Sequence, residues 1–209
     1  KMSILFRFWA PESDMYDVMA YESLLSELYL QQGIQIPQDG VPEFNVHCTG
    51  LASEQYPVLS DLLSLIDSKL SAVPTRQTAV QKELMLDDLR RLRNVRAVIQ
   101  SIVKNYGNVF DGHTSIENLL DTQLVFFNIR HLAAMKPEIF QAQLYSVLSL
   151  CWDNALRVGI PMKSLYESQS IEWEEITRFF IVIDEAHRIV NAGNLTAVQQ
   201  LTIMAREDR

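Results

Sequence analysis

Residues 179–185 restrict the fold of this chain more than any other segment. Five apolar residues, Phe179 to Ile183, lead directly into two adjacent carboxylates, Asp184 and Glu185. Short runs of β-branched and aromatic residues are typical of strands that are buried on both faces of a parallel sheet. Because the burial of a charge is costly, we expect both acids where the strand leaves the core. The pattern therefore predicts an α/β fold with acids at the carboxyl end of a strand.

Acids at this position are candidates for a binding site, because open α/β sheets bind ligands beyond the carboxyl ends of their strands. In nucleotide hydrolases, an Asp at this place holds Mg²⁺, directly or through water, and a neighbouring Glu can orient the attacking water. Asp184 and Glu185 are our candidates for these two roles. The alternative is a core strand that simply ends in two solvated acids.

The bulk properties exclude several classes of protein. The 209 residues suffice for one large or two small domains, and the net charge of -8 argues against general polyanion binding. No apolar run approaches the roughly 20 residues that span a bilayer, and we expect no signal peptide. Two lone cysteines, Cys48 and Cys151, make no disulfide framework and suit a reducing cytosol. With Lys at its start and no evident stop signal at its end, the chain is expected to be a piece of a longer protein.

The apolar pattern divides the chain into two parts. Residues 1–110 show helical spacing, with a stripe from Leu59 to Leu70 and a longer one over about residues 75–105, which Gly107 should end. Residues 111–209 change to a β-α-β pattern, with a second strand at 124–129 and a helix from Pro137 to about Arg157, which Gly159 and Pro161 should end. We therefore predict an all-α subdomain followed by part of a parallel-sheet core.

The longer helix carries a charged face, with Arg90, Arg91, Arg93 and Arg96 beside Asp87 and Asp88. The simpler interpretation is a solvent-exposed helix face whose charged side chains form salt bridges with one another. A contact with nucleic acid or an acidic partner is the alternative.

A phosphate-binding loop is missing from the sequence. Residues 107–114 have the glycine spacing and the final Thr of such a loop, but His113 replaces the required Lys and Asp111 would repel phosphate. The window also follows a helix instead of a strand. The chain thus carries only the acidic, metal-side half of a nucleotide site, and alone it should bind ATP weakly or not at all.

Four stretches occur in the order found in one family. Residues 181–189 resemble the Walker B strand of the conjugative, type IV secretion ATPases, which belong to the RecA-like, FtsK/HerA-type hexameric translocases. The Phe-Asp-Gly-His-Thr segment at 110–114, the helix around Gln143 to Asp153 and the Arg-rich segment at 204–209 are similar to further motifs of that family. The resemblance implies a partial RecA-like core at 111–209 and a helical insertion at 1–110.

The resemblance also implies roles for individual residues and partners. Asp184 corresponds to the acid that binds Mg²⁺ and Glu185 to the residue that activates water, while Arg206 and Arg209 would reach the ATP of a neighbouring subunit. The parent protein would be a cytoplasmic homo-hexamer, peripheral to the inner membrane, that works with other secretion subunits on a DNA or protein substrate. The missing phosphate loop lies upstream of residue 1 in the family's order.

Two other functions stay open. Residues 184–187, Asp-Glu-Ala-His, also form the signature of DEAH-type helicases, although the long helical part before them fits that class poorly. A non-catalytic module, in which the helical half is the binding surface, is the third hypothesis.

Overall fold

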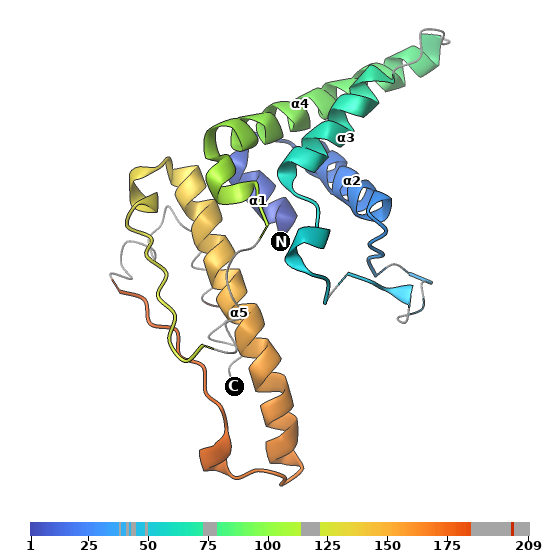
Figure 1. Ribbon diagram of the computed structural model, residues 1–209. Coiled ribbons are helices and arrows are strands. Elements are labelled where there is room, and N and C mark those ends of the chain that lie inside the picture. Colours follow the sequence, from blue (N-terminus) through green and yellow to red (C-terminus); the bar gives the residue numbers. More distant parts are fainter. Residues whose placement is uncertain are drawn as a thin grey trace. The chain divides into compact units, whose positions relative to one another are not determined.

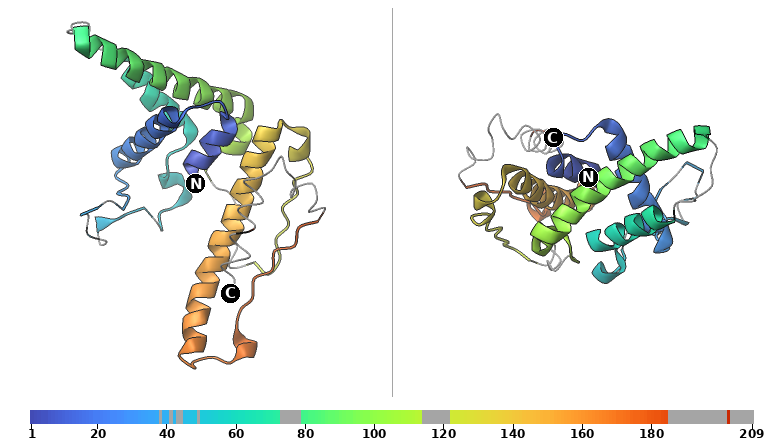
Figure 2. Two further views of the ribbon diagram at one scale, coloured as in Figure 1. Left: turned by 180° about the vertical axis from the view of Figure 1, so that it is seen from behind. Right: turned by 90° about the horizontal axis from the view of Figure 1, so that it is seen from above.

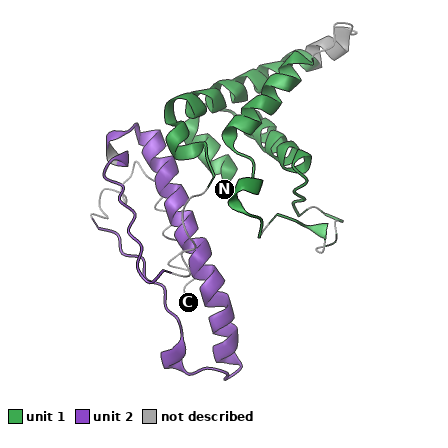
Figure 3. Ribbon diagram, viewed as in Figure 1, with its two compact units in different colours: residues 1–115 green, residues 116–209 purple. Residues whose placement is uncertain are grey.

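The computed structural model describes residues 1–37, 39, 40, 42, 45–48, 50–72, 79–113, 122–184 and 202. These fall into two compact units, residues 1–115 and 116–209 (Figure 3). Each unit has its own secondary structure and its own buried residues.

The described residues of the first unit form four α-helices that pack on one another (Figures 1 and 2). They are α1 (Met2–Trp9), α2 (Met15–Gln31), α3 (Leu59–Ser71) and α4 (Ala79–Phe110), with a short 3-10 helix, η2 (Ser53–Gln55), before α3. Helices α2, α3 and α4 contact each other pairwise, and α1 packs on α2. The largest fully buried side chains of the unit are Phe6, Tyr21, Leu62, Ile66, Val95 and Ile99.

The sequence periodicity explains these helices and most of their ends. The stripe predicted from Leu59 to Leu70 is α3, and four of its apolar residues are buried. Helix α2 begins after Asp14, whose carboxylate accepts a hydrogen bond from the Asp17 amide, and Gly33 follows its end with a φ of 74°. Helix α4 is interrupted at Tyr106, directly before Gly107, and continues to Phe110.

The second unit contains the helix α5 (Pro137–Glu167) and two 3-10 helices, η4 (Leu132–Ala134) and η5 (Trp173–Glu175). Pro137 occupies the first turn of α5, as predicted. The expected end at Gly159 and Pro161 is wrong, because α5 runs through both residues. Cys151 is buried in this helix, and burial raises the pKa of its thiol.

The predicted α/β fold with a RecA-like parallel sheet is wrong for the part of the chain that the structure describes. No described residue lies in a strand, and all of the regular elements are helical. Residues 124–129 and 178–183 are instead extended segments that run along α5, both in the direction opposite to the helix (Figure 1). No backbone hydrogen bond joins these two segments. Without that ladder, an extended apolar segment is not a strand.

Candidate functional site

The predicted catalytic residues fall at the end of the second extended segment. Asp184 is exposed and follows Ile183, which packs against Leu144 and Leu148 of α5. The expected burial of this run on both faces is wrong, because Phe180 and Val182 are 81% and 90% exposed. Glu185, Arg206 and Arg209 lie outside the described residues.

The first extended segment ends at the same place on α5. Ile129 packs against the same two leucines as Ile183. The ends of the two segments therefore meet on one apolar cluster, although no sheet connects them. Asn128, the polar residue near the end of this segment, is exposed and accepts a hydrogen bond from the amide of Arg130 at 3.1 Å. This bond holds the turn that follows the segment.

Residues 107–114, which have the glycine spacing of a phosphate-binding loop, include a residue with a structural role. Residues 107–110 are the end of α4, and the Asp111 carboxylate accepts a hydrogen bond from the amide of Ser60 at 2.9 Å. Ser60 lies in the first turn of α3, where free amides and the helix dipole favour a negative charge. Asp111 thus stabilises the start of α3, and an anionic phosphate has no place beside it.

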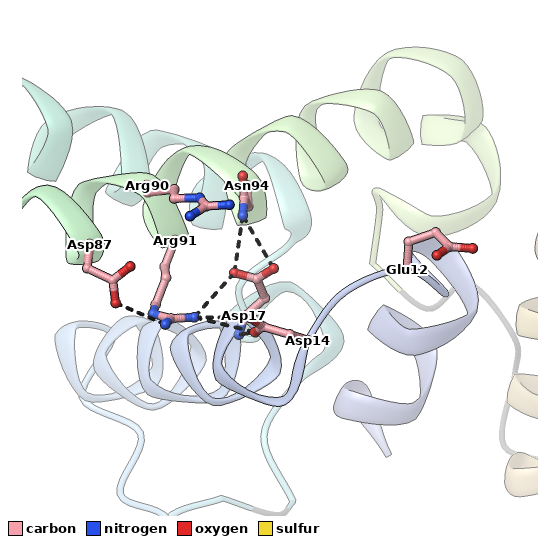
Figure 4. A pocket seen from close by; sticks show the side chains of 7 residues that line it. All are labelled: Glu12, Asp14, Asp17, Asp87, Arg90, Arg91 and Asn94. Atoms are coloured by element: carbon pink, nitrogen blue, oxygen red, sulfur yellow. Dashed lines mark hydrogen bonds and ion pairs between the residues drawn. The ribbon is translucent and has the colours of Figure 1, made fainter.

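A polar cluster in the first unit is the best-defined group of charged side chains in the described chain. It surrounds Arg91, on α4, whose guanidinium lies 2.9 Å from the Asp87 carboxylate, 3.4 Å from Asp14 and 4.0 Å from Asp17 (Figure 4). The same group stacks over the ring of Tyr16 at 4.6 Å. One arginine therefore ties α4 to the first turn of α2.

Asp17 is the buried member of this cluster, with 7% of its surface exposed. Its carboxylate accepts hydrogen bonds of 3.3 and 3.4 Å from the side-chain amide of Asn94, in addition to its contact with Arg91. A buried carboxylate needs such partners, because an uncompensated charge in the interior is costly.

Asp14 has an unusual electrostatic environment for an exposed residue. Its carboxylate accepts the Asp17 amide at 2.8 Å and faces Arg91. The hydrogen bond from the Asp17 backbone, followed by the positive charge of Arg91, holds the pKa of Asp14 below its usual value despite some loss of hydration.

A shallow pocket of about 240 Å³ lies over this cluster, and Figure 4 shows the side chains that line it. Its lining consists of Glu12, Asp14, Asp17, Asp87, Arg90, Arg91 and Asn94. Most of these charged side chains form ion pairs with one another, and two of the pairs join the start of α2 to α4. The cluster therefore holds the two helices together. No group of three potential metal ligands occurs among the described residues.

The charged face of α4 is thus more than a solvated surface. The sequence indicated salt bridges within the helix, and Arg91 with Asp87 is such a pair. It did not indicate that Arg91 also reaches α2, or that Arg96 pairs with Asp67 of α3. The only local signal was the spacing of Asp14 and Asp17 at the start of α2.

Comparisons with known proteins add a relative without a known function. No family model and no solved structure matches the sequence. An uncharacterized protein of Bacillus anthracis, pXO2-09, is 29% identical over 210 residues. The match covers 100% of this chain and 31% of the relative, so the chain spans less than a third of the length of the curated relative that it matches. None of the helices in the described residues is sufficiently long and apolar to cross a membrane.

Proposed function

We propose that this chain is part of an ATP-hydrolysing motor of a conjugative transfer or type IV secretion system. In the full-length protein, Asp184 would hold the Mg²⁺ of bound ATP and Glu185 would activate the attacking water. Arg206 and Arg209 would act on the ATP of a neighbouring subunit. The phosphate-binding loop would come from another part of the longer chain.

The apolar run that ends in Asp184 and Glu185 carries this proposal. Ile183 packs on α5, and Asp184, the next residue, is exposed. A carboxylate that holds the metal of a nucleotide must lie where the metal can approach it from outside the core. The order of the resembling segments along the chain supports the same assignment.

The partners of the motor are part of the proposal. ATP and Mg²⁺ are its cofactors, and a homo-hexamer with other secretion subunits is its assembly. It would work in the cytoplasm at the inner membrane, where it would energise pilus assembly or move a DNA or protein substrate.

Hydrolysis by the full-length protein tests the proposal. Magnesium-dependent release of phosphate from ATP should fall by about 10²–10⁴-fold in Glu185→Gln, the usual loss for a general base. Binding of ATP, followed with a fluorescent analogue, should persist. Glu174→Gln, at an exposed glutamate of η5, is the matched control and should leave the rate unchanged. Normal turnover by Glu185→Gln would remove Glu185 from the mechanism.

Residues 1–209 alone provide a second arm of the test. We expect no hydrolysis above background, because the sequence contains only the metal-side half of a site. Robust magnesium-dependent hydrolysis by this piece would contradict the half-site hypothesis. Absence of ATP binding by the full-length protein would favour the non-catalytic module, and ATP-driven unwinding of a nucleic-acid duplex would favour the helicase.

A further inference from the structure

The two extended segments of the second unit have an inner and an outer side. In an extended chain, successive side chains point in opposite directions. Along the second segment, Phe179 and Ile181 are 40% and 38% exposed, whereas Phe180 and Val182 are 81% and 90% exposed. Ile183 continues the less exposed set and packs on α5. The even-numbered residues therefore form the outer side.

The first segment repeats this alternation. Leu124 and Phe126 are 69% and 85% exposed, while Val125 is 38% exposed. Phe127 is half-buried and Ile129 packs on α5. Both segments are thus anchored on the same helix by one side and present large apolar side chains on the other.

The outer side is an unusual surface for a protein in water. Single exposed apolar residues are common, but neighbouring large ones mark a surface that another chain segment covers. Residues 124–129 and 179–183 contain no charged side chain. No backbone hydrogen bond connects residues 179–183 to another described residue. Burial of the exposed apolar side chains is favourable, and the backbone groups of an added extended segment could pair with those of residues 179–183, so an apolar segment fits this surface better than a charged one.

We propose that the outer apolar face, formed by Leu124, Phe126, Phe180 and Val182, is an internal interface of the longer protein. Its occupant is an apolar segment of the same polypeptide from outside residues 1–209. In the relative from Bacillus anthracis, the part that matches this chain is 31% of the protein, so more than two thirds of that polypeptide lies outside the matched part. A covalently linked segment binds at a high effective concentration and needs no second molecule.

Hydrogen exchange tests the interface without reference to ATP hydrolysis, so its failure is distinct from failure of the motor proposal. Amides of residues 124–127 and 179–183 should exchange at least about 100-fold more slowly in the full-length protein than in residues 1–209, since burial and pairing protect them. Equal protection in both would mean that residues 1–209 supply the cover, and fast exchange in both would mean that nothing covers the face. Either result overturns the proposal.

A pair of variants of the full-length protein locates the interface. Val182→Asp places a charge in the proposed contact and should restore fast exchange to residues 124–127 as well as to its own segment. Asn128→Asp places a charge on the same outer side at a position that is already polar and should leave the exchange unchanged. Protection that rises with the concentration of residues 1–209 would identify a second copy as the occupant and overturn the proposal.

Discussion

At the scale of single residues, Asp14 combines two roles that are usually separate. It caps α2 through the Asp17 amide, and it supplies one of the three carboxylates around Arg91. The cap fixes the carboxylate of Asp14 at the first turn of α2, where Arg91 of α4 can reach it. A local capping signal thus becomes a contact between two helices, through residues that lie 77 positions apart in the sequence.

Asp14 should make the stability of the first unit depend on acid. Its folded-state pKa is lower than the ordinary 3.8, so its charged form stabilises the folded state above that pH. This contribution is lost as the pH falls through the lower, folded-state pKa. In urea unfolding between pH 6 and pH 2, we expect Asp14→Asn to lower the midpoint at pH 6 and to converge with the wild type at pH 2. Asn keeps the helix cap, so the difference reports the charge.

Asp88→Asn is the control for this measurement, because Asp88 is an exposed carboxylate of α4. Its unfolding midpoint should follow that of the wild type across the whole pH range. An Asp14→Asn protein with a pH-independent deficit would show that the charge of Asp14 does not contribute.

At the scale of secondary structure, α5 is the clearest departure from expectation. Gly159 and Pro161 were predicted to break it, yet the helix continues to Glu167. Pro161 has no amide to donate to the carbonyl four residues earlier, and its ring crowds that carbonyl. The residue is exposed, so the freed carbonyl group can bond to water.

Pro161 should therefore weaken the last turns of α5. Pro161→Ala restores the missing amide and should slow hydrogen exchange of residues 162–167, by a local stabilisation of up to about 3 kcal/mol. Lys163→Arg, at an exposed position of the same turn, should change nothing. Unaltered exchange in Pro161→Ala would mean that the proline does not limit this part of the helix.

The elements show which features local sequence determines. Helical stripes and Pro137 predicted α3 and the start of α5 because periodicity and capping act within a few residues. The run from Phe179 to Ile183 predicted a strand buried on both faces of a sheet, and this prediction is wrong, because the segment has no strand partner among the described residues and Phe180 and Val182 are 81% and 90% exposed. It did not determine a strand, since a strand needs a partner that local sequence does not supply. The contacts of Arg91 were missed for the same reason, because they join distant helices.

At the scale of the whole molecule, the two units differ in how completely they bury their apolar side chains. The first unit buries Phe6, Tyr21, Leu62 and Ile99 among its own four helices. The described residues of the second unit form one long helix with extended segments along it, and apolar side chains remain exposed on the outer side of these segments. We therefore expect the first unit to be stable without the rest of the chain, whereas the second unit should depend on additional cover.

Residues 1–115 alone should thus unfold in one cooperative, helical transition, measured by far-ultraviolet circular dichroism during urea titration. Ile99→Ala removes a fully buried side chain and should cost about 2–5 kcal/mol both in this piece and in residues 1–209. Leu30→Ala, at a residue that is 51% exposed, should cost less than about 0.5 kcal/mol in both. An equal cost of Ile99→Ala in the two lengths means that the core of the first unit is complete within residues 1–115. A cost that appears only in the longer chain would mean that the second unit supplies part of that core.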